Sequence, residues 1–136
     1  MTHDDFEQKA QTYWEHYQHA CEKHPFFADR IMTPYPLVVD ANDSEKYQTL
    51  VKKHNKEVIR LYKNIAQERK KERDKDPTAD NVLRAETGEI WFAVAQGDLQ
   101  QAHYEIADTI AVLMRLDEAL EELYEQTVKP RLEKDK

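Results

Sequence analysis

The chain has 136 residues, of which 35% are charged and only two are glycine, a composition that favours helices over a sheet. This length suits a single domain, residues 1–136, with a core of moderate size. The net charge of −7 argues against general nucleic-acid binding, but not against nucleotides bound through a metal ion.

Membrane spans, a signal peptide and the number of cysteines each indicate the compartment in which a protein works. No apolar stretch is long enough to cross a membrane, and no N-terminal signal peptide is visible. A single cysteine excludes an internal disulfide and fits a reducing compartment. We therefore expect a cytoplasmic protein that binds neither membranes nor nucleic acid.

Residues 3–22 have the pattern of an amphipathic helix. Phe6, Ala10, Tyr13 and Tyr17 recur at helical spacing along one stripe, which predicts a packing surface in preference to a ligand site. The pattern breaks from about residue 24 to 44, a segment with three prolines that oppose helix formation. We expect an irregular connection there.

A long helix is predicted over residues 44–73, where apolar residues recur every three or four positions. Eleven of the 20 Lys and Arg residues of the chain lie between 44 and 75, so its other faces are basic. A solvated basic face is the simplest interpretation. The alternative is that Lys52, Lys56 or Arg60 reaches the phosphates of a substrate.

Two further helices should follow, joined by a tight turn. Asp76-Pro77 fits an N-cap followed by proline at the first helical position. Gly97-Asp98 fits a helix stop and a new N-cap, and Gln101 stands where a capping box requires it. The second of these helices should end near Pro130. Together they form an antiparallel helical hairpin.

Each helix of this hairpin carries a pair of acids three residues apart. Glu86 and Glu89 lie on the first helix, and Glu105 and Asp108 lie on the second. Spacing of three puts both carboxylates of a pair on one helical face, bordering the apolar stripe. If these faces meet, four carboxylates converge, and they would repel one another strongly unless a cation held them.

Such an acidic group predicts a hard divalent cation with oxygen ligands, Mg²⁺ with Mn²⁺ as a substitute. Magnesium commonly takes its remaining ligands from substrate phosphates. A di-iron bundle needs Glu-x-x-His units, and no Glu in this chain has a His three residues later. The competing interpretation is that the acids only form a solvated face.

The segment ETGEIWFAVAQGD followed by YEIADTIAVLMRL resembles the MazG-type family of all-α nucleoside triphosphate pyrophosphohydrolases. That family's pattern is Glu-Glu-x-x-Glu, a short hairpin and then Glu-x-x-Asp. Glu86 and Glu89 match the later two glutamates of the first half, and Glu105 and Asp108 match the second half. The resemblance covers about a quarter of the chain.

The resemblance implies a four-helix, bundle-like domain that assembles as a homodimer or homotetramer. It also implies Mg²⁺-dependent cleavage of nucleoside triphosphates to monophosphate and pyrophosphate, by attack of water at the α-phosphorus. In this interpretation all four acids would hold the metal, or one of them, with Glu86 and Glu89 as equal candidates, would act as the general base instead of a ligand.

Two residues depart from the family pattern. Ala85 stands where the family has its leading Glu, and Arg115 stands where many members have Asn. Arg115 lies on the same face as Asp108 and could bind a phosphate through its planar guanidinium. The alternative function, supported by Ala85, is a catalytically weakened helical module that binds nucleotides or a protein partner.

Overall fold

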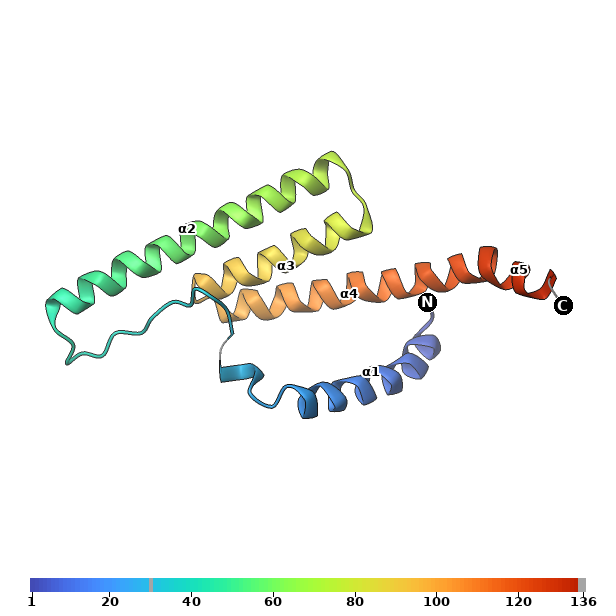
Figure 1. Cartoon of the computed structure of the whole chain (residues 1–136), viewed down its shortest axis with the longest axis horizontal. Coiled ribbons are helices and arrows are strands. Elements are labelled where there is room, and N and C mark those ends of the chain that lie inside the picture. The colour runs from blue at the N-terminus through green and yellow to red at the C-terminus, as the bar shows by residue number, and fades with distance from the viewer. Residues whose placement is uncertain (30, 135–136) are drawn as a thin grey trace. The chain divides into compact units, whose positions relative to one another are not determined.

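The computed structural model describes residues 1–29 and 31–134, and every regular element within these ranges is helical (Figure 1). The all-α prediction is therefore confirmed. No helix in the described part of the chain is long and apolar enough to cross a membrane. The elements in order are α1 (His3–Lys23), a 3-10 turn η1 (Phe27–Asp29), α2 (Glu45–Lys75), α3 (Ala79–Ala95), α4 (Leu99–Leu123), a π-helical turn η2 (Tyr124–Val128) and α5 (Lys129–Lys134).

The chain divides into two compact units, Met1–Thr33 and Pro34–Lys136. The first contains α1 and η1, and the second contains the remaining helices. That the whole chain acts as a single domain stays a prediction. The helical hairpin with its acids lies entirely within the second unit.

Helix α1 begins and ends close to its predicted bounds. Its start is fixed by a capping box in which the Thr2 hydroxyl accepts from Asp5 N at 3.1 Å and the Asp5 carboxylate accepts from Thr2 N at 2.9 Å. None of the helix's residues is buried. The apolar stripe along α1 is therefore at least partly exposed, and its role as a packing surface stays a prediction.

The connection before α2 is irregular, as predicted, apart from the short turn η1. Within the second unit it is tied to α2 by side-chain bonds to its backbone. The Asn55 amide both donates to the Leu37 carbonyl and accepts from Leu37 N, each at 2.8 Å. His54 Nε2 lies 3.0 Å from the Tyr35 carbonyl oxygen. These bonds satisfy backbone groups that have no helical partner.

Helices α2, α3 and α4 pack in sequence, with α3 in contact with both neighbours. In Figure 1, α2 and α3 run antiparallel. Small residues allow α2 and α3 to lie close together. A Cβ added at Gly88 would come within 3.1 Å of Arg69 Cδ and 3.4 Å of Ala66 Cα. The buried apolar residues of the described second unit are mostly small: Val51, Val58, Ala66, Ala85, Ala93, Ala95 and Ala102.

The predicted start of α3 at Asp76-Pro77 is wrong by two residues. Asp76 ends α2, and Thr78 is the N-cap of α3, with its hydroxyl accepting from Asn81 N at 3.2 Å. The Asn81 side chain also donates to the Asp76 carbonyl at 2.8 Å, which fixes the turn. A hydroxyl two residues after Asp76 competes successfully for the capping position.

The predicted turn between α3 and α4 is present at Gly97-Asp98. Gly97 has φ of 76°, a left-handed conformation that glycine adopts without steric cost. The Asp98 carboxylate accepts from Gln101 N at 3.0 Å. The reciprocal half of the capping box is absent, because Asp98 N donates to the Ala93 carbonyl and the Gln101 amide donates to Glu105.

The predicted helix end near Pro130 is also wrong. Helical backbone continues through η2 into α5, to Lys134. Proline cannot donate the usual hydrogen bond, and its ring clashes with the carbonyl four residues earlier. A wider π-helical turn immediately before Pro130 is a known way to accommodate such a disturbance without ending the helix.

Candidate metal centre

Three of the four predicted acids come together between α3 and α4. Carboxylate oxygens of Glu86, Glu105 and Asp108 all lie within 4.8 Å of one another. Glu86 and Glu105 are half-buried, and Asp108 is exposed. The three-residue spacing within α4 and the tight turn at Gly97 place the acids from two helices at one point, as expected from helical periodicity.

The position of Glu86 between these acids has an electrostatic consequence. Burial raises the pKa of Glu86 above its ordinary value, and the negative charges of Glu105 and Asp108 raise it further. The charge of Arg73 acts in the opposite direction. A divalent cation would remove this repulsion and take oxygen ligands from both helices, so the side chains present fit Mg²⁺ or Mn²⁺.

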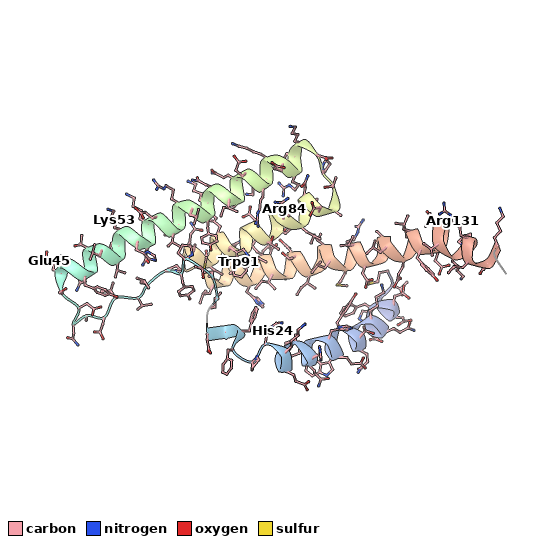
Figure 2. The ribbon with its side chains drawn as sticks, in the orientation of Figure 1. His24, Glu45, Lys53, Arg84, Trp91 and Arg131 are labelled. Carbon is pink, nitrogen blue, oxygen red and sulfur yellow. The ribbon has the colours of Figure 1, made fainter. Side chains whose placement is uncertain are left out.

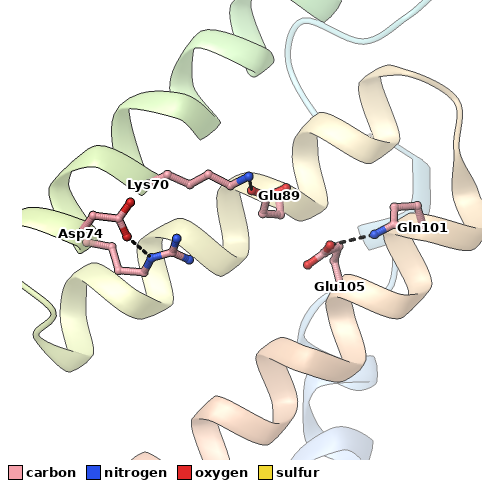
Figure 3. A network of polar contacts seen from close by, with 6 residues as sticks. Lys70, Asp74, Glu89, Gln101 and Glu105 are labelled. Carbon is pink, nitrogen blue, oxygen red and sulfur yellow. Dashed lines mark hydrogen bonds and ion pairs between the residues drawn. The ribbon is translucent and has the colours of Figure 1, made fainter.

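Glu89, the fourth predicted ligand, makes a different contact. Its Oε1 lies 2.6 Å from Lys70 Nζ on α2, and Figure 3 shows the two side chains meeting between the helices. Glu89 Oε1 is shielded from solvent. Glu105, by contrast, accepts from Gln101 Nε2 at 2.8 Å (Figure 3). The structure thus brings three acids together and pairs the fourth with a lysine.

Lys70 and Arg73 are basic residues beside the acids that sequence reasoning did not single out. Arg73 is half-buried, and its Nε lies 3.3 Å from Asp74 Oδ1. The basic candidates named from the sequence, Lys52, Lys56 and Arg60, are all exposed and lie earlier on α2. The missing information was the register of α2 against α3, which decides which cations face the acids.

The two departures from the family pattern occupy contrasting environments. Ala85 is fully buried, with 0% of its surface exposed. Arg115 is exposed on α4, seven residues after Asp108 and about 10 Å further along the helix axis at 1.5 Å per residue. A phosphate contact by Arg115 stays a prediction.

A second group of potential ligands, His3, Asp4 and Glu7, lies at the start of α1. All three residues are exposed and belong to one helix. Exposed acidic residues within a single turn are common without a metal, and nothing else about this group indicates a ligand. The group of Glu86, Glu105 and Asp108 differs because it joins two helices and is partly buried.

Comparison with models of protein families, with curated proteins and with solved structures gave no match. The resemblance to MazG-type enzymes therefore depends on the acidic motif residues and the turn between them.

The crowding of the acids predicts how stability depends on pH without metal. Because the pKa of Glu86 is raised in the folded state, its ionisation opposes folding. Its favourable contribution is present below 4.5, the ordinary pKa, and is lost as pH rises through the folded-state value. Glu86→Gln should therefore match the parent at low pH and exceed its stability at neutral pH, measured by urea unfolding in EDTA.

Glu122→Gln is the matched control, because it removes one negative charge from an exposed position on α4 outside the acidic group. Its effect should reflect only the general reduction of negative charge. Equal stabilisation by Glu86→Gln and Glu122→Gln at neutral pH would contradict a local cost of ionising Glu86 from its burial and from the neighbouring acids.

Proposed function

We propose that this protein is a Mg²⁺-dependent nucleoside triphosphate pyrophosphohydrolase that yields nucleoside monophosphate and pyrophosphate. The observation that carries the proposal is the approach of Glu86, Glu105 and Asp108 within 4.8 Å from two helices. Convergent, partly buried carboxylates suit a hard cation, and such ions commonly bind phosphates. The motif resemblance supports the nucleotide as substrate, and Mn²⁺ is the expected substitute ion.

In this proposal Glu86, Glu105 and Asp108 hold the ion, and Glu89 is the fourth ligand. Bound Mg²⁺ would neutralise phosphate charge and lower the pKa of a water molecule. One of the two acids of α3, Glu86 or Glu89 with equal support, would act as the general base in place of a ligand. Arg115 is the proposed phosphate contact on α4. The proposed location is the cytoplasm, since a single cysteine fits a reducing compartment and nucleoside triphosphates are cytoplasmic substrates.

A second candidate function is a weakened module that binds nucleotides without cleaving them. The observation that favours it is the complete burial of Ala85, at the position of the family's leading Glu. No carboxylate from this position can reach the metal, so the centre has one acid fewer than the family pattern. Activity measurements separate the two candidates.

The first prediction of the proposed function concerns activity. The parent should release pyrophosphate from at least one member of a panel of ribo- and deoxynucleoside triphosphates with Mg²⁺. Glu105→Gln should lower this rate on the order of 100-fold or more, since a ligand is lost. Glu122→Gln should retain the parental rate.

Full activity of Glu105→Gln at low Mg²⁺ would contradict a role of the acids in the mechanism. Nucleotide binding without release of pyrophosphate would favour the weakened module.

The position of bond cleavage is the next prediction. The chain has no glycine-rich phosphate-binding loop, since its two glycines are isolated at 88 and 97. Attack at the γ-phosphate in the manner of a P-loop enzyme therefore has no support. The resemblance to MazG-type enzymes implies that water attacks the α-phosphorus and that pyrophosphate leaves with Mg²⁺. Hydrolysis in ¹⁸O-labelled water should put the label in the nucleoside monophosphate and none in pyrophosphate. Inorganic phosphate together with a nucleoside diphosphate would contradict this mechanism.

The proposal includes self-association. Ile106, Ile110, Leu113 and Leu120 lie along one side of α4, and each is between 42% and 54% exposed. Their spacing of four, three and seven residues matches the heptad repeat with which one helix packs along another. A second copy of α4 has the same repeat, and we therefore propose that this face joins two copies.

Sedimentation velocity over a wide range of concentration tests this interface. The parent should sediment as a dimer or tetramer, and the double variant Ile110→Lys/Leu113→Lys should sediment as a monomer, because buried unpaired lysines oppose association. Ala111→Lys, at an exposed position between them, should leave assembly unchanged. A parent that remains monomeric at every concentration would overturn self-association.

A further inference from the structure

Lys70 of α2 pairs with Glu89 of α3, the acid that lies three residues after Glu86. Lys70 Nζ is 2.6 Å from Glu89 Oε1, and Figure 3 shows the two side chains meeting between the helices. Spacing of three residues puts Glu89 on the same face of α3 as Glu86, so this ion pair borders the acidic group.

Helices α2 and α3 lie close together beside this ion pair. Gly88 lies against Ala66 and Arg69, where a Cβ would meet their atoms at 3.1–3.4 Å. Arg69 is fixed to α3, because its Nη1 donates to the Arg84 carbonyl at 3.2 Å and to the Thr87 hydroxyl at 3.3 Å. Lys70 has only the carboxylate of Glu89 as a described partner.

The properties of Lys70 suit a contact that can be exchanged. Its side chain is 49% exposed, whereas that of Glu89 is 21% exposed. A lysine ammonium is a point charge on a flexible stem, so it can turn towards another anion. Glu89 Oε1 is shielded from solvent, so Glu89 leaves Lys70 only when another cation, such as a bound metal ion, takes the place of the ammonium.

We propose that Lys70 holds Glu89 while no cation is bound, and that it contacts a substrate phosphate once Glu89 becomes a metal ligand. This inference rests on the proposed function and adds a phosphate-binding residue to it. Lys70 competes with the cation for Glu89 in the absence of substrate. In the presence of substrate, the same ammonium offsets charge on the phosphates.

The two roles predict opposite effects of one substitution. Lys70→Met removes the charge and keeps a flexible apolar stem. It should bind Mn²⁺ alone about threefold more tightly, because Glu89 is no longer paired. With saturating Mg²⁺ it should bind imidodiphosphate, a pyrophosphate analogue that resists hydrolysis, about tenfold more weakly, because a charge-assisted contact is lost. Electron paramagnetic resonance measures the first affinity, and calorimetry measures the second.

Lys71→Met is the matched control, since it removes the same charge from the next, exposed position of α2. Its long-range electrostatic effect resembles that of Lys70→Met, but it has no contact with Glu89. Lys70→Arg, which retains the charge, should restore most of the imidodiphosphate affinity and serves as a check that the site is folded. Failure of the parent to bind Mn²⁺ would overturn the proposed metal centre itself. If the parent binds Mn²⁺ but Lys70→Met and Lys71→Met behave alike, the role of Lys70 is refuted and the metal centre stands.

Discussion

The close packing of α3 against its two neighbours is the constraint on which the candidate site depends. On the α2 side, a Cβ at Gly88 would come within 3.1 Å of the Arg69 side chain and into van der Waals contact with Ala66 at 3.4 Å. On the α4 side, Ala102 and Thr109 are buried, and the Thr109 hydroxyl donates to the Glu105 carbonyl at 2.8 Å. Small or internally bonded side chains at these seams bring the longer acidic and basic side chains at their edges within contact distance.

This packing creates an electrostatic conflict that the fold itself relieves only in part. Burial and the charges of Glu105 and Asp108 together raise the pKa of Glu86, so ionisation of this acid is opposed in the folded state. Protonation, cations from α2 or a bound metal ion can each reduce the repulsion between the acids. Arg73 supplies the second of these means for Glu86, and Lys70 supplies it for Glu89. The chain has a basic α2 followed by an acidic hairpin, and at this site basic side chains of α2 lie beside acids of the hairpin.

Most of the helical architecture could be predicted from the sequence, because periodicity and capping residues are local signals. Ser44 starts α2 and Asp98 starts α4 through side-chain bonds to the first turn. Predictions were wrong where two local signals competed. Thr78 caps α3 in place of Asp76, and the π-helical turn carries the backbone past Pro130. The sequence also does not reveal which basic residues of α2 face α3. Lys53, for example, lies on the side of α2 that faces away from α3 (Figure 2).

The composition of the site was predictable to the same extent. Equal spacing of the acids indicates which side chains share a helical face, and three of the four carboxylates meet. The partner of Glu89 was not predictable, because periodicity fixes positions around one helix but neither the rotation nor the register of its neighbour. In Figure 3, Lys70 and Glu89 meet from α2 and α3, helices whose facing positions no local pattern specifies.

Charge balance links these side chains to the stoichiometry of the proposed metal centre. The four predicted acids carry four negative charges when ionised, and Lys70 offsets the charge of Glu89 while Arg73 is paired with Asp74. Glu86, Glu105 and Asp108 then leave three negative charges, which the proposed site can offset with one divalent ion before substrate binds. A second ion in that state would create excess positive charge in a partly buried place, which is unfavourable without further anions. Substrate phosphates supply such anions, and they also give the Lys70 ammonium an alternative partner. In the proposed mechanism, this charge balance favours one ion before substrate binds and ties the exchange of Glu89 to the arrival of phosphate.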